Sequence, residues 1–392
     1  MPRGPGKSDL RRFGLSAVGV VSRLGAGHPT GPVRKILVIR PDHLGDLLFL
    51  TPALRRLRAA RPDAEITALV GPWARPILER NPDVDALFTW DIPFFNRRGK
   101  VSVVEPYSSA IRLARELRAR RFDAALVMRF DFWWGALAAQ LAGIPRRVGY
   151  AIPEVVPFVS EAVPYSAGPL HEVERNLDLV GAFLGSRPAT TADDRLVYPL
   201  SEGEVAEAEA VLGAQGVGSG EPLVAIHPGA GAALKLWTPE GFGVVANALA
   251  RKLGARIVLT GGPAERELVA AVAAHCEAPP VQVLGETSLG GVAAIYRRSR
   301  LVVGTDSGPL HIAVAVGTPT VHMFGPVDER LFGPWGEPER HQIVRIPLPC
   351  APCNRLDICS LPDRSRACML RITPGQVLAA AERALASAER PV

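Results

Sequence analysis

Short apolar runs of the strand type alternate with helical stretches along almost the whole chain. Strands are expected at residues 35–40, 65–70, 86–90 and 122–128 in the first half, and at 223–227, 256–260, 281–284, 301–304 and 320–324 in the second. Apolar residues at helical spacing lie between them, as at 110–121 and 171–184, and a last helix is expected at 374–389. Strands that alternate with helices form parallel sheets covered by helices on both faces. The chain is therefore expected to be an α/β protein.

The strand–helix pattern is interrupted once, at residues 186–194, where Pro188 and small polar residues indicate a linker. A chain of 392 residues is long enough for two domains at ~150 residues each. We expect an N-terminal extension at 1–34, a Rossmann-like domain at 35–190, a second at 191–373 and a C-terminal helix at 374–392. Two doubly wound domains that face each other form a cleft, and ligands bind such sheets beyond the carboxyl ends of their strands.

The positive charge of the chain is confined to its N-terminus. The 45 Lys and Arg residues outnumber the 39 Asp and Glu residues, and residues 1–35 alone carry the whole excess of +6. The rest of the chain is neutral by formal charge, and it has no basic face with interleaved aromatic residues. Nucleic acid is therefore not an expected partner.

Within the basic segment, residues 8–24 have an amphipathic pattern. Apolar residues recur at i, i+3, i+7, i+11 and i+14 from Leu10, and the arginines lie off this stripe. A basic amphipathic helix can lie on an anionic membrane surface. The alternatives are a plain extension, which Gly14 and Gly19 favour, and a cleaved signal peptide. The longest uncharged stretch, 307–327, contains several prolines and glycines and is expected to belong to a soluble core rather than to span a membrane.

The first motif, RPDHLGDLLFLTPAL at residues 40–54, joins the first strand to the first helix. Gly45 would let the backbone turn tightly before the helix, and Asp46 would lie in the first helical turn. A carboxylate at this position can cap the helix, or it can project into a cleft as a general base. From the residues alone, both roles stay open.

The second motif, IHPGAGAALKLWTPEGF at residues 226–242, follows a strand and precedes a helix that Thr238 is expected to cap. Gly229 and Gly231 would expose backbone N–H groups to an anion, and Lys235 could neutralise a phosphate. A Walker loop requires Gly-Lys-Ser/Thr, which this motif lacks. By itself the motif is a modest signal for phosphate binding.

The third motif, VVGTDSGPLHIAVAVGTPTVHMFGP at residues 302–326, also runs from a strand into a helix, which is expected to begin near Pro309. The N–H groups of the first helical turn and the nearby hydroxyls would face an anion there. His311 lies on that first turn, where it can either contact a ligand or pack as a satisfied core histidine.

Together the three motifs resemble glycosyltransferase family 9, the ADP-heptose:lipopolysaccharide heptosyltransferases. The resemblance covers residues 35–390 and rests on Gly45-Asp46, on Lys235 with Trp237, on the DSGxxH signature at 306–311 and on FGP at 324–326. It implies a GT-B fold with an N-terminal acceptor domain and a C-terminal nucleotide-sugar domain. It also implies an inverting glycosyltransferase that requires no metal or other cofactor.

The resemblance also implies roles for individual residues. Asp46 matches the proposed catalytic base of the family, and Lys235 matches the lysine that contacts the donor diphosphate. The donor-side positions are Gly229, Lys235, Trp237, Glu265, Thr305, Asp306, Ser307, Gly308 and His311, and the acceptor-side positions are Arg40 and Gly45. Arg129 is a further acceptor-side candidate from the residues themselves, because it lies near Trp133 and Trp134, which would either line the acceptor cleft or pack in the core. Glu265 is the candidate for binding the nucleotide ribose, with Glu267 as its competitor.

Four of the five cysteines, Cys350, Cys353, Cys359 and Cys368, lie close together in the sequence. Five cysteines are too few for a disulfide-stapled secreted scaffold. A CxxC pair followed by two more cysteines can form a tetrahedral metal site, but the second half lacks the paired spacing of a zinc ribbon. A structural metal and reduced or regulatory thiols are therefore the two interpretations of this cluster.

The expected function is the transfer of a heptose or related sugar from a nucleotide-diphosphate donor, ADP-heptose above all, to a lipopolysaccharide-core-like or other surface-glycan acceptor. Its partners would be that donor, a lipid-linked glycan and the membrane surface. Its place would be the cytoplasm, peripheral on the inner face of the cytoplasmic membrane. The alternatives are a transferase for another nucleotide-sugar and a non-catalytic sugar-nucleotide- or glycan-binding protein. The joint presence of Asp46, Lys235 and Asp306 argues against a non-catalytic protein.

Overall fold

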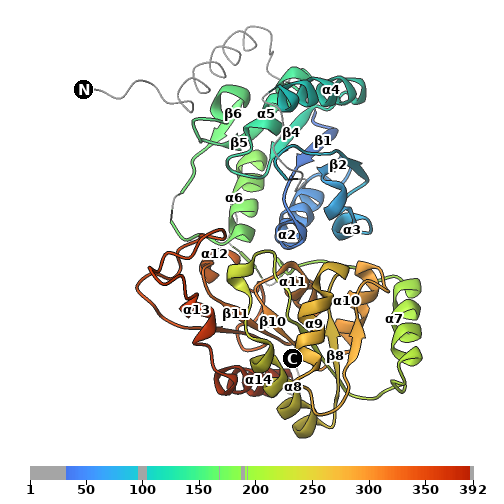
Figure 1. The fold of residues 1–392 in the computed structure, drawn as a ribbon. Helices are drawn as coiled ribbons and strands as arrows, with labels where there is room; N and C mark the ends of the chain where they lie inside the picture. The colour runs from blue at the N-terminus through green and yellow to red at the C-terminus, as the bar shows by residue number, and fades with distance from the viewer. Residues whose placement is uncertain (1–31, 96–103, 167, 187–189, 192, 389–392) are drawn as a thin grey trace. The chain divides into compact units, whose positions relative to one another are not determined.

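The computed structural model describes residues 32–95, 104–166, 168–186, 190–191 and 193–388. The chain forms two compact units, Met1–Asp194 and Arg195–Val392, and each has its own parallel sheet (Figure 1). The boundary between the units comes at the end of the segment 186–194. The amphipathic stripe expected at residues 8–24 lies outside the described residues.

The first unit is built on a six-stranded parallel sheet with the order β3-β2-β1-β4-β5-β6. Its strands are β1 Lys35–Ile39, β2 Glu65–Val70, β3 Ala86–Thr89, β4 Ala124–Val127, β5 Arg146–Tyr150 and β6 Glu161–Val163. Its helices are α2 Leu44–Ala60, α3 Arg75–Leu78, α4 Glu105–Arg120, α5 Trp133–Leu141 and α6 Glu172–Leu184, with 3-10 turns η1 Pro72–Ala74 and η2 Val156–Phe158.

Strand β1 lies at the centre of the first sheet because its apolar residues can be buried on both faces. Leu37 pairs with Thr67 of β2 and with Ala125 of β4, and it packs in the same core cluster as residues of α4 and α5. Helices α2 and α6 pack against each other. Helix α6 begins in a capping box, in which His171 accepts a hydrogen bond from the Val173 N–H and Glu174 accepts one from the His171 N–H.

The second unit repeats this architecture with the strand order β12-β11-β10-β7-β8-β9. Its strands are β7 Leu223–His227, β8 Arg256–Thr260, β9 Val281–Val283, β10 Leu301–Thr305, β11 Thr320–Phe324 and β12 His341–Arg345. Its helices are α7 Glu202–Ala214, α8 Pro239–Leu253, α9 Arg266–Ala273, α10 Leu289–Arg298, α11 Gly308–Ala315, α12 Glu329–Phe332, α13 Ala367–Leu370 and α14 Pro374–Ala388, with 3-10 turns η3 Ala233–Lys235 and η4 Pro263–Glu265.

Two helices of the second unit show how the sequence sets their positions. Helix α8 begins at Pro239, and Thr238 caps it by accepting a hydrogen bond from the Gly241 N–H over 3.1 Å. Helix α14 packs against β11, β12 and α8, and its buried residues, among them Val377 and Ala381, belong to the main core cluster of this unit. The C-terminal helix is therefore part of the second unit's core.

Every strand expected from the sequence is present, with ends that agree to within two residues. Three further strands, β5, β6 and β12, were not expected. Strand β5 begins with Arg146 and Arg147, and β6 has only three residues, two of them exposed. Strand β12 lies at a sheet edge, and only His341 and Val344 of its five residues are buried. Charged or half-exposed strands lack the continuous apolar run that marks a central parallel strand.

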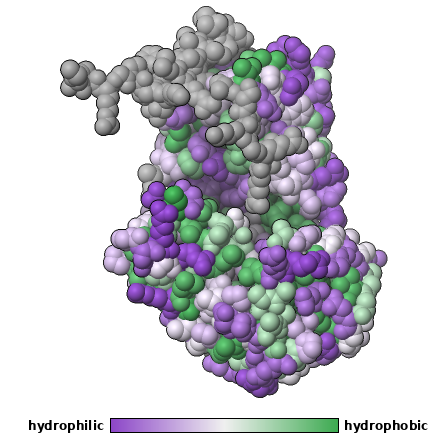
Figure 2. Space-filling view, in the orientation of Figure 1, coloured by the Kyte–Doolittle hydropathy of each residue, from purple (hydrophilic) through white to green (hydrophobic). Residues whose placement is uncertain are grey.

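The apolar residues of both units are concentrated in the sheets and the helix faces that cover them. The uncharged stretch 307–327 forms α11 and β11, and β11 is buried throughout, as the sequence predicted for a core segment. Figure 2 shows hydrophilic and hydrophobic residues interspersed over the visible face of each unit. No helix within the described residues is long and apolar enough to cross a membrane.

Candidate active site

In both sheets the strand order reverses beside the first strand of the unit. Strand β1 lies between β2 and β4, and β7 lies between β8 and β10. Ligands of open α/β sheets bind at such a point, beyond the carboxyl ends of the strands. The three sequence motifs follow β1, β7 and β10, so the fold brings each of them to the expected binding point of its own sheet.

Asp46 lies in the first turn of α2, shortly after β1. Its side chain is 27% exposed, and its Oδ1 lies 3.6 Å from Nη2 of Arg40. Burial and the Asp42 carboxylate raise the pKa of Asp46 to about 7, against the opposing effect of Arg40. A carboxylate that only capped the helix would have a lowered pKa, because the helix N-terminus favours the charged form. The raised pKa and the partial exposure favour the general-base interpretation.

Arg40 follows β1 directly, and its side chain is only 2% exposed. Its Nη1 donates hydrogen bonds to the Met128 carbonyl and to Oδ1 of Asn176, both over 3.0 Å. Its Nη2 donates to Oε2 of Glu172 over 3.0 Å, and its Nε lies 2.6 Å from Oδ2 of Asp42. Arg40 is therefore enclosed by protein groups and acts as a buried counter-ion, which leaves little of it for an acceptor to contact.

Arg129 follows β4 and joins the same charged cluster. Its Nη1 pairs with Oδ1 of Asp42, and its Nε donates to Oδ1 of Asp131 over 2.6 Å. The guanidinium also lies over the ring of Phe95, 5.2 Å from its centroid. Because its side chain is 30% exposed, Arg129 is the cation of this cluster that can reach a ligand in solvent.

Three members of this cluster were missed by the sequence analysis: Asp42, Glu172 and Asn176. Asp42 lies within the first motif, of which the sequence analysis singled out Arg40, Gly45 and Asp46. Glu172 and Asn176 lie on α6, four residues apart, and this spacing puts both side chains on one face of a helix. The spacing could have marked Glu172 and Asn176 as a pair, but it does not show that their face of α6 is directed at Arg40.

In the second unit Lys235 and Asp306 form a nearly buried ion pair. Lys235 ends η3 in the loop after β7, and Asp306 follows β10; their Nζ and Oδ2 atoms lie 2.8 Å apart. Nε2 of His311 lies 3.6 Å from the other carboxylate oxygen. Burial alone would raise the pKa of Asp306, but Lys235 and His311 outweigh it and lower the pKa to about 2. The ionised Asp306 therefore holds the Lys235 ammonium at the binding point of this sheet.

Helix α11 begins at Gly308 beside this ion pair. Ser307 is its N-cap residue, and the Ser307 Oγ is buried without a hydrogen-bond partner. A hydroxyl and free N–H groups at a helix N-terminus are suited to an anionic ligand. Thr305, in contrast, is fully buried, and its hydroxyl donates to the Gly229 carbonyl over 2.8 Å. Thr305 therefore ties the second motif to the third and does not itself face a ligand.

Glu265, at the end of η4, lies against the loop that contains Gly229. A Cβ added at Gly229 would come 1.7 Å from Oε1 of Glu265, so glycine is required for this approach. The other oxygen of Glu265 accepts a hydrogen bond from the Gly262 N–H over 2.7 Å. Glu267 is exposed on α9 and is not part of this contact. The geometry therefore favours Glu265 over Glu267 as the carboxylate beside the phosphate loop.

Comparison with known proteins identifies the family to which this site belongs. The family described as glycosyltransferase family 9 (heptosyltransferase) matches residues 110–360. Lipopolysaccharide heptosyltransferase 3 of Escherichia coli is 30% identical over 299 residues, which is 74% of this chain and 83% of that protein. The chain belongs to glycosyltransferase family 9. It is thus a glycosyltransferase, and the family predicted from its three motifs is confirmed.

Solved structures show that this family 9 glycosyltransferase has the expected fold. A family 9 glycosyltransferase from Veillonella parvula superposes with a TM-score of 0.78 at 23% identity, over 92% of this chain and 100% of that one. ADP-heptose lipopolysaccharide heptosyltransferase II of E. coli superposes with a TM-score of 0.72 at 23% identity, over 91% and 100%. With the two parallel six-stranded sheets, these similarities confirm the GT-B fold.

Besides Arg40 and Thr305, two more residues of the family 9 site differ from the sequence-based expectation. Gly45 does not make a turn before the helix, because α2 already begins at Leu44 and Gly45 lies within it. Trp237 does not face the donor loop: its side chain is in the core, packs on Phe242 with ring centroids 5.0 Å apart and donates to the Ile372 carbonyl. The indole thus buries apolar area in the core of the second unit and anchors the end of the loop that contains Lys235.

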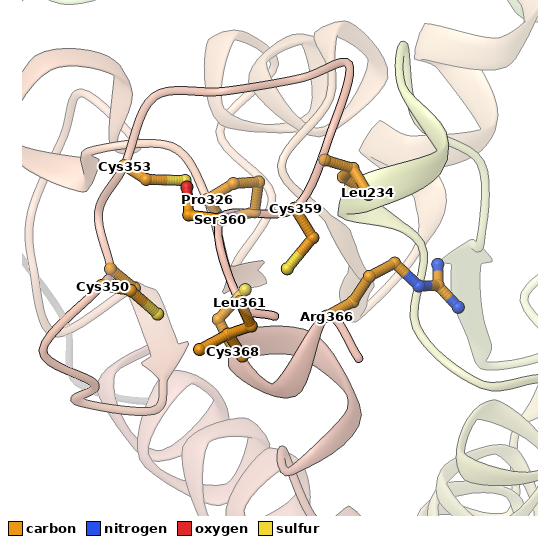
Figure 3. A pocket seen from close by; sticks show the side chains of 10 residues that line it. Leu234, Pro326, Cys350, Cys353, Cys359, Ser360, Leu361, Arg366 and Cys368 are labelled. Atoms are coloured by element: carbon orange, nitrogen blue, oxygen red, sulfur yellow. The ribbon is translucent and has the colours of Figure 1, made fainter. Parts of the chain in front are cut away.

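The cysteine cluster lies against η3, the turn that carries Lys235: Leu234 lines the pocket of the cluster, and Arg366 of that pocket donates to the Ala233 carbonyl over 2.7 Å. Cys350, Cys353, Cys359 and Cys368 line one small pocket, together with Leu234 and other residues (Figure 3). All are free thiols, and burial and the neighbouring cysteines raise the pKa of Cys368. Within the described part of the chain, no group of three or more His, Cys, Asp or Glu side chains is arranged to hold a metal ion. The structure thus gathers the four thiols without an arranged ligand set.

Proposed function

We propose that this family 9 enzyme transfers a heptose from ADP-heptose to a lipopolysaccharide-core-type acceptor, with inversion at the anomeric carbon and without a metal ion. The names of its relatives, lipopolysaccharide heptosyltransferase 3 and ADP-heptose lipopolysaccharide heptosyltransferase II, support this donor and this class of acceptor. The observation that carries the proposal is the partly exposed Asp46 with its pKa of about 7. A base with that pKa is poised to accept a proton at neutral pH.

In this proposal each unit binds one of the two substrates. Residues 35–190 bind the acceptor, because the base candidate Asp46 and the partly exposed Arg129 follow the central strands of the first sheet. Residues 191–373, with the helix at 374–392, bind the nucleotide-sugar. Lys235, the N-terminus of α11 and Glu265 support this assignment, since they supply a cation, N–H donors and a carboxylate for a ribose.

The reaction is a single displacement. Asp46 takes the proton from an acceptor hydroxyl as that oxygen attacks the anomeric carbon. A new glycosidic C–O bond forms while the bond from the anomeric carbon to the diphosphate oxygen breaks, and ADP leaves with the bonding electron pair. Attack from the face opposite the leaving group inverts the anomeric centre. The products are the glycosylated acceptor, ADP and protonated Asp46, which returns its proton to solvent.

The leaving diphosphate gains negative charge, and in this proposal protein groups stabilise it. The Lys235 ammonium is held by Asp306, and the N–H groups at the start of α11 and the unpartnered Ser307 hydroxyl lie beside this pair. Charges and dipoles that are already in place when the reaction begins are usually the largest catalytic contribution. They give a physical reason why a metal ion would not be required.

The proposal places the enzyme on the inner face of the cytoplasmic membrane, where a lipid-linked acceptor is exposed to a soluble nucleotide-sugar. The basic excess of residues 1–35 and the apolar stripe of residues 8–24 support this placement. Cations next to an apolar helix face bind anionic lipid headgroups.

Replacement of Asp46 by asparagine tests the proposal. The variant keeps the shape of the side chain but cannot accept the proton, so donor binding should survive while transfer is lost by at least about 10²-fold. Calorimetric titration with ADP measures donor binding, and ADP release in the presence of acceptor measures transfer. Asp131→Asn, which removes a carboxylate from the same cluster but not from the base position, is the matched control and should retain most activity. Full transfer by Asp46→Asn would overturn the assignment of the base.

A further inference from the structure

Glu172 and Asp46 share one nitrogen of Arg40. Oε2 of Glu172 accepts a hydrogen bond from Nη2 of Arg40 over 3.0 Å, whereas Oδ1 of Asp46 lies 3.6 Å from the same Nη2. The shorter contact is a hydrogen-bonded ion pair, and the longer one exceeds the range of a charge-assisted hydrogen bond. Glu172 is therefore the primary partner of this nitrogen, and Asp46 is a secondary one.

The remaining contacts of Arg40 prevent it from turning toward Asp46. Oδ2 of Asp42 is in ion-pair contact with its Nε over 2.6 Å, and Asn176 and the Met128 carbonyl accept hydrogen bonds from its Nη1. The Asn176 amide also donates to the Phe49 carbonyl of α2 over 3.0 Å, which links α6 to the helix that carries Asp46. Nη1 and Nη2 of Arg40 are thus hydrogen-bonded to groups other than Asp46, and Nε is in ion-pair contact with Asp42, so the loss of the Glu172 contact would free Nη2 to approach Asp46.

The charged groups that act on Asp46 come from three segments of the first unit. Arg40 and Asp42 follow β1, Arg129 follows β4, and Glu172 lies on α6. Asp42 and Glu172 oppose the effect of the two arginines on Asp46, in addition to the effect of burial. An arginine in close, unshared contact with a carboxylate lowers its pKa by about 1–3 units. Such a carboxylate would be ionised at neutral pH but would be a weak base.

We propose that Glu172 is a positioning residue for sugar transfer: it holds Nη2 of Arg40 and so prevents a close Arg40–Asp46 ion pair that would weaken the base. This inference rests on the proposed role of Asp46 as the base. It makes α6 part of the catalytic apparatus, although α6 lies more than a hundred residues from Asp46 in the sequence. Glu172 itself is 10% exposed and contacts no reacting group.

The test is the pH dependence of transfer in Glu172→Gln, which has the same shape but no charge. The acid limb of kcat, measured at saturating donor and acceptor, should move to lower pH by about one unit. The kcat on the alkaline plateau should fall, because a less basic carboxylate removes the proton more slowly. A carbon-13 NMR titration of the Asp46 carboxyl in the ligand-free protein should show the same shift. Glu161→Gln, which removes a carboxylate from the Arg146–Glu161 pair of the same unit, is the matched control and should leave both titrations unchanged.

The outcomes separate this inference from the proposed function. If folded Glu172→Gln titrates like the wild type in both experiments while Asp46→Asn is inactive, Glu172 has no positioning role and Asp46 remains the base. If Asp46→Asn retains full transfer, the proposed base is wrong, and an unshifted NMR titration would also overturn the claim about Glu172. If Glu172→Gln does not fold, Glu172→Asp replaces it. Its shorter carboxylate withdraws from Nη2, so a smaller shift in the same direction is expected, and an unshifted titration overturns the proposal.

Discussion

Replacing Lys235 with methionine removes the counter-ion of Asp306 and preserves most of the volume of the side chain. In the wild type the two side chains are only 13% and 8% exposed, and their charged atoms lie 2.8 Å apart. Without the ammonium, burial raises the pKa of Asp306, and a charged carboxylate in this position has lost its main partner. We expect the second unit to lose stability at neutral pH and the enzyme to lose ~10²-fold in kcat, as when one oxyanion-hole donor is removed.

The size of the stability loss follows from the pKa of Asp306, which is about 2 in the folded chain against an ordinary value of 3.8. The difference of nearly two units corresponds to about 2–3 kcal/mol of stability at neutral pH, at ~1.4 kcal/mol per unit. Because the folded-state pKa is lowered, this stability is fully present above pH 3.8 and is lost as the pH falls through about 2. The difference between wild type and Lys235→Met should therefore shrink as the pH is lowered.

Urea unfolding, followed by tryptophan fluorescence, measures this difference. At pH 7 the Lys235→Met variant should unfold with a free energy about 2–3 kcal/mol below that of the wild type, and at pH 3 the gap should be about half of that or less. Lys252→Met is the matched control in the same unit, because Lys252 pairs with Glu382 at an exposed position and should leave the unfolding midpoint unchanged. An equal loss at both pH values, or no loss at pH 7, would refute the account of this ion pair.

Two further predictions concern the donor loop and the N-terminus. In Gly229→Ala the new Cβ would clash with Oε1 of Glu265 and displace this carboxylate from the donor ribose, so the KM for ADP-heptose should rise about tenfold. Gly213→Ala, which has no atom near the new Cβ, is the control and should leave the KM unchanged. An unchanged donor KM in Gly229→Ala would remove Glu265 from the donor site. Deletion of residues 1–30 should weaken sedimentation with anionic vesicles and leave transfer to a soluble acceptor unchanged; undiminished vesicle binding would show that this segment is not the membrane contact.

The sequence predicted well those features that depend on the pattern of neighbouring residues. A buried strand followed by a small-residue loop and a helix defines a binding point in any open parallel sheet, so the motifs around Asp46, Lys235 and Asp306 could be placed before the structure was known. Thr238 followed by proline marked the start of α8, and the structure has that cap. The central strands were equally clear because they are buried on both faces.

Contacts between distant segments could not be predicted in this way. Glu172 and Asn176 contact Arg40 across more than 130 residues of sequence, and no residue pattern in either segment predicts this contact. Trp237 lies two residues after Lys235, the lysine expected to contact a phosphate. The two side chains nevertheless diverge between η3 and the start of α8, and the indole enters the core. Neighbours at the end of a loop can face opposite directions, so adjacency in a motif is weak evidence for a shared role.

The central claim is tested most directly by a transfer assay with the purified full-length chain. ADP-, GDP- and UDP-sugars are each offered with a truncated lipopolysaccharide core, and mass spectrometry of the acceptor is compared with the nucleotide released, with and without a chelator. The account predicts that ADP-heptose alone supports transfer, that one heptose is gained for each ADP released, that the new linkage is inverted, and that the chelator has no effect. Transfer from another nucleotide-sugar but not from ADP-heptose, or loss of transfer with the chelator, would contradict it.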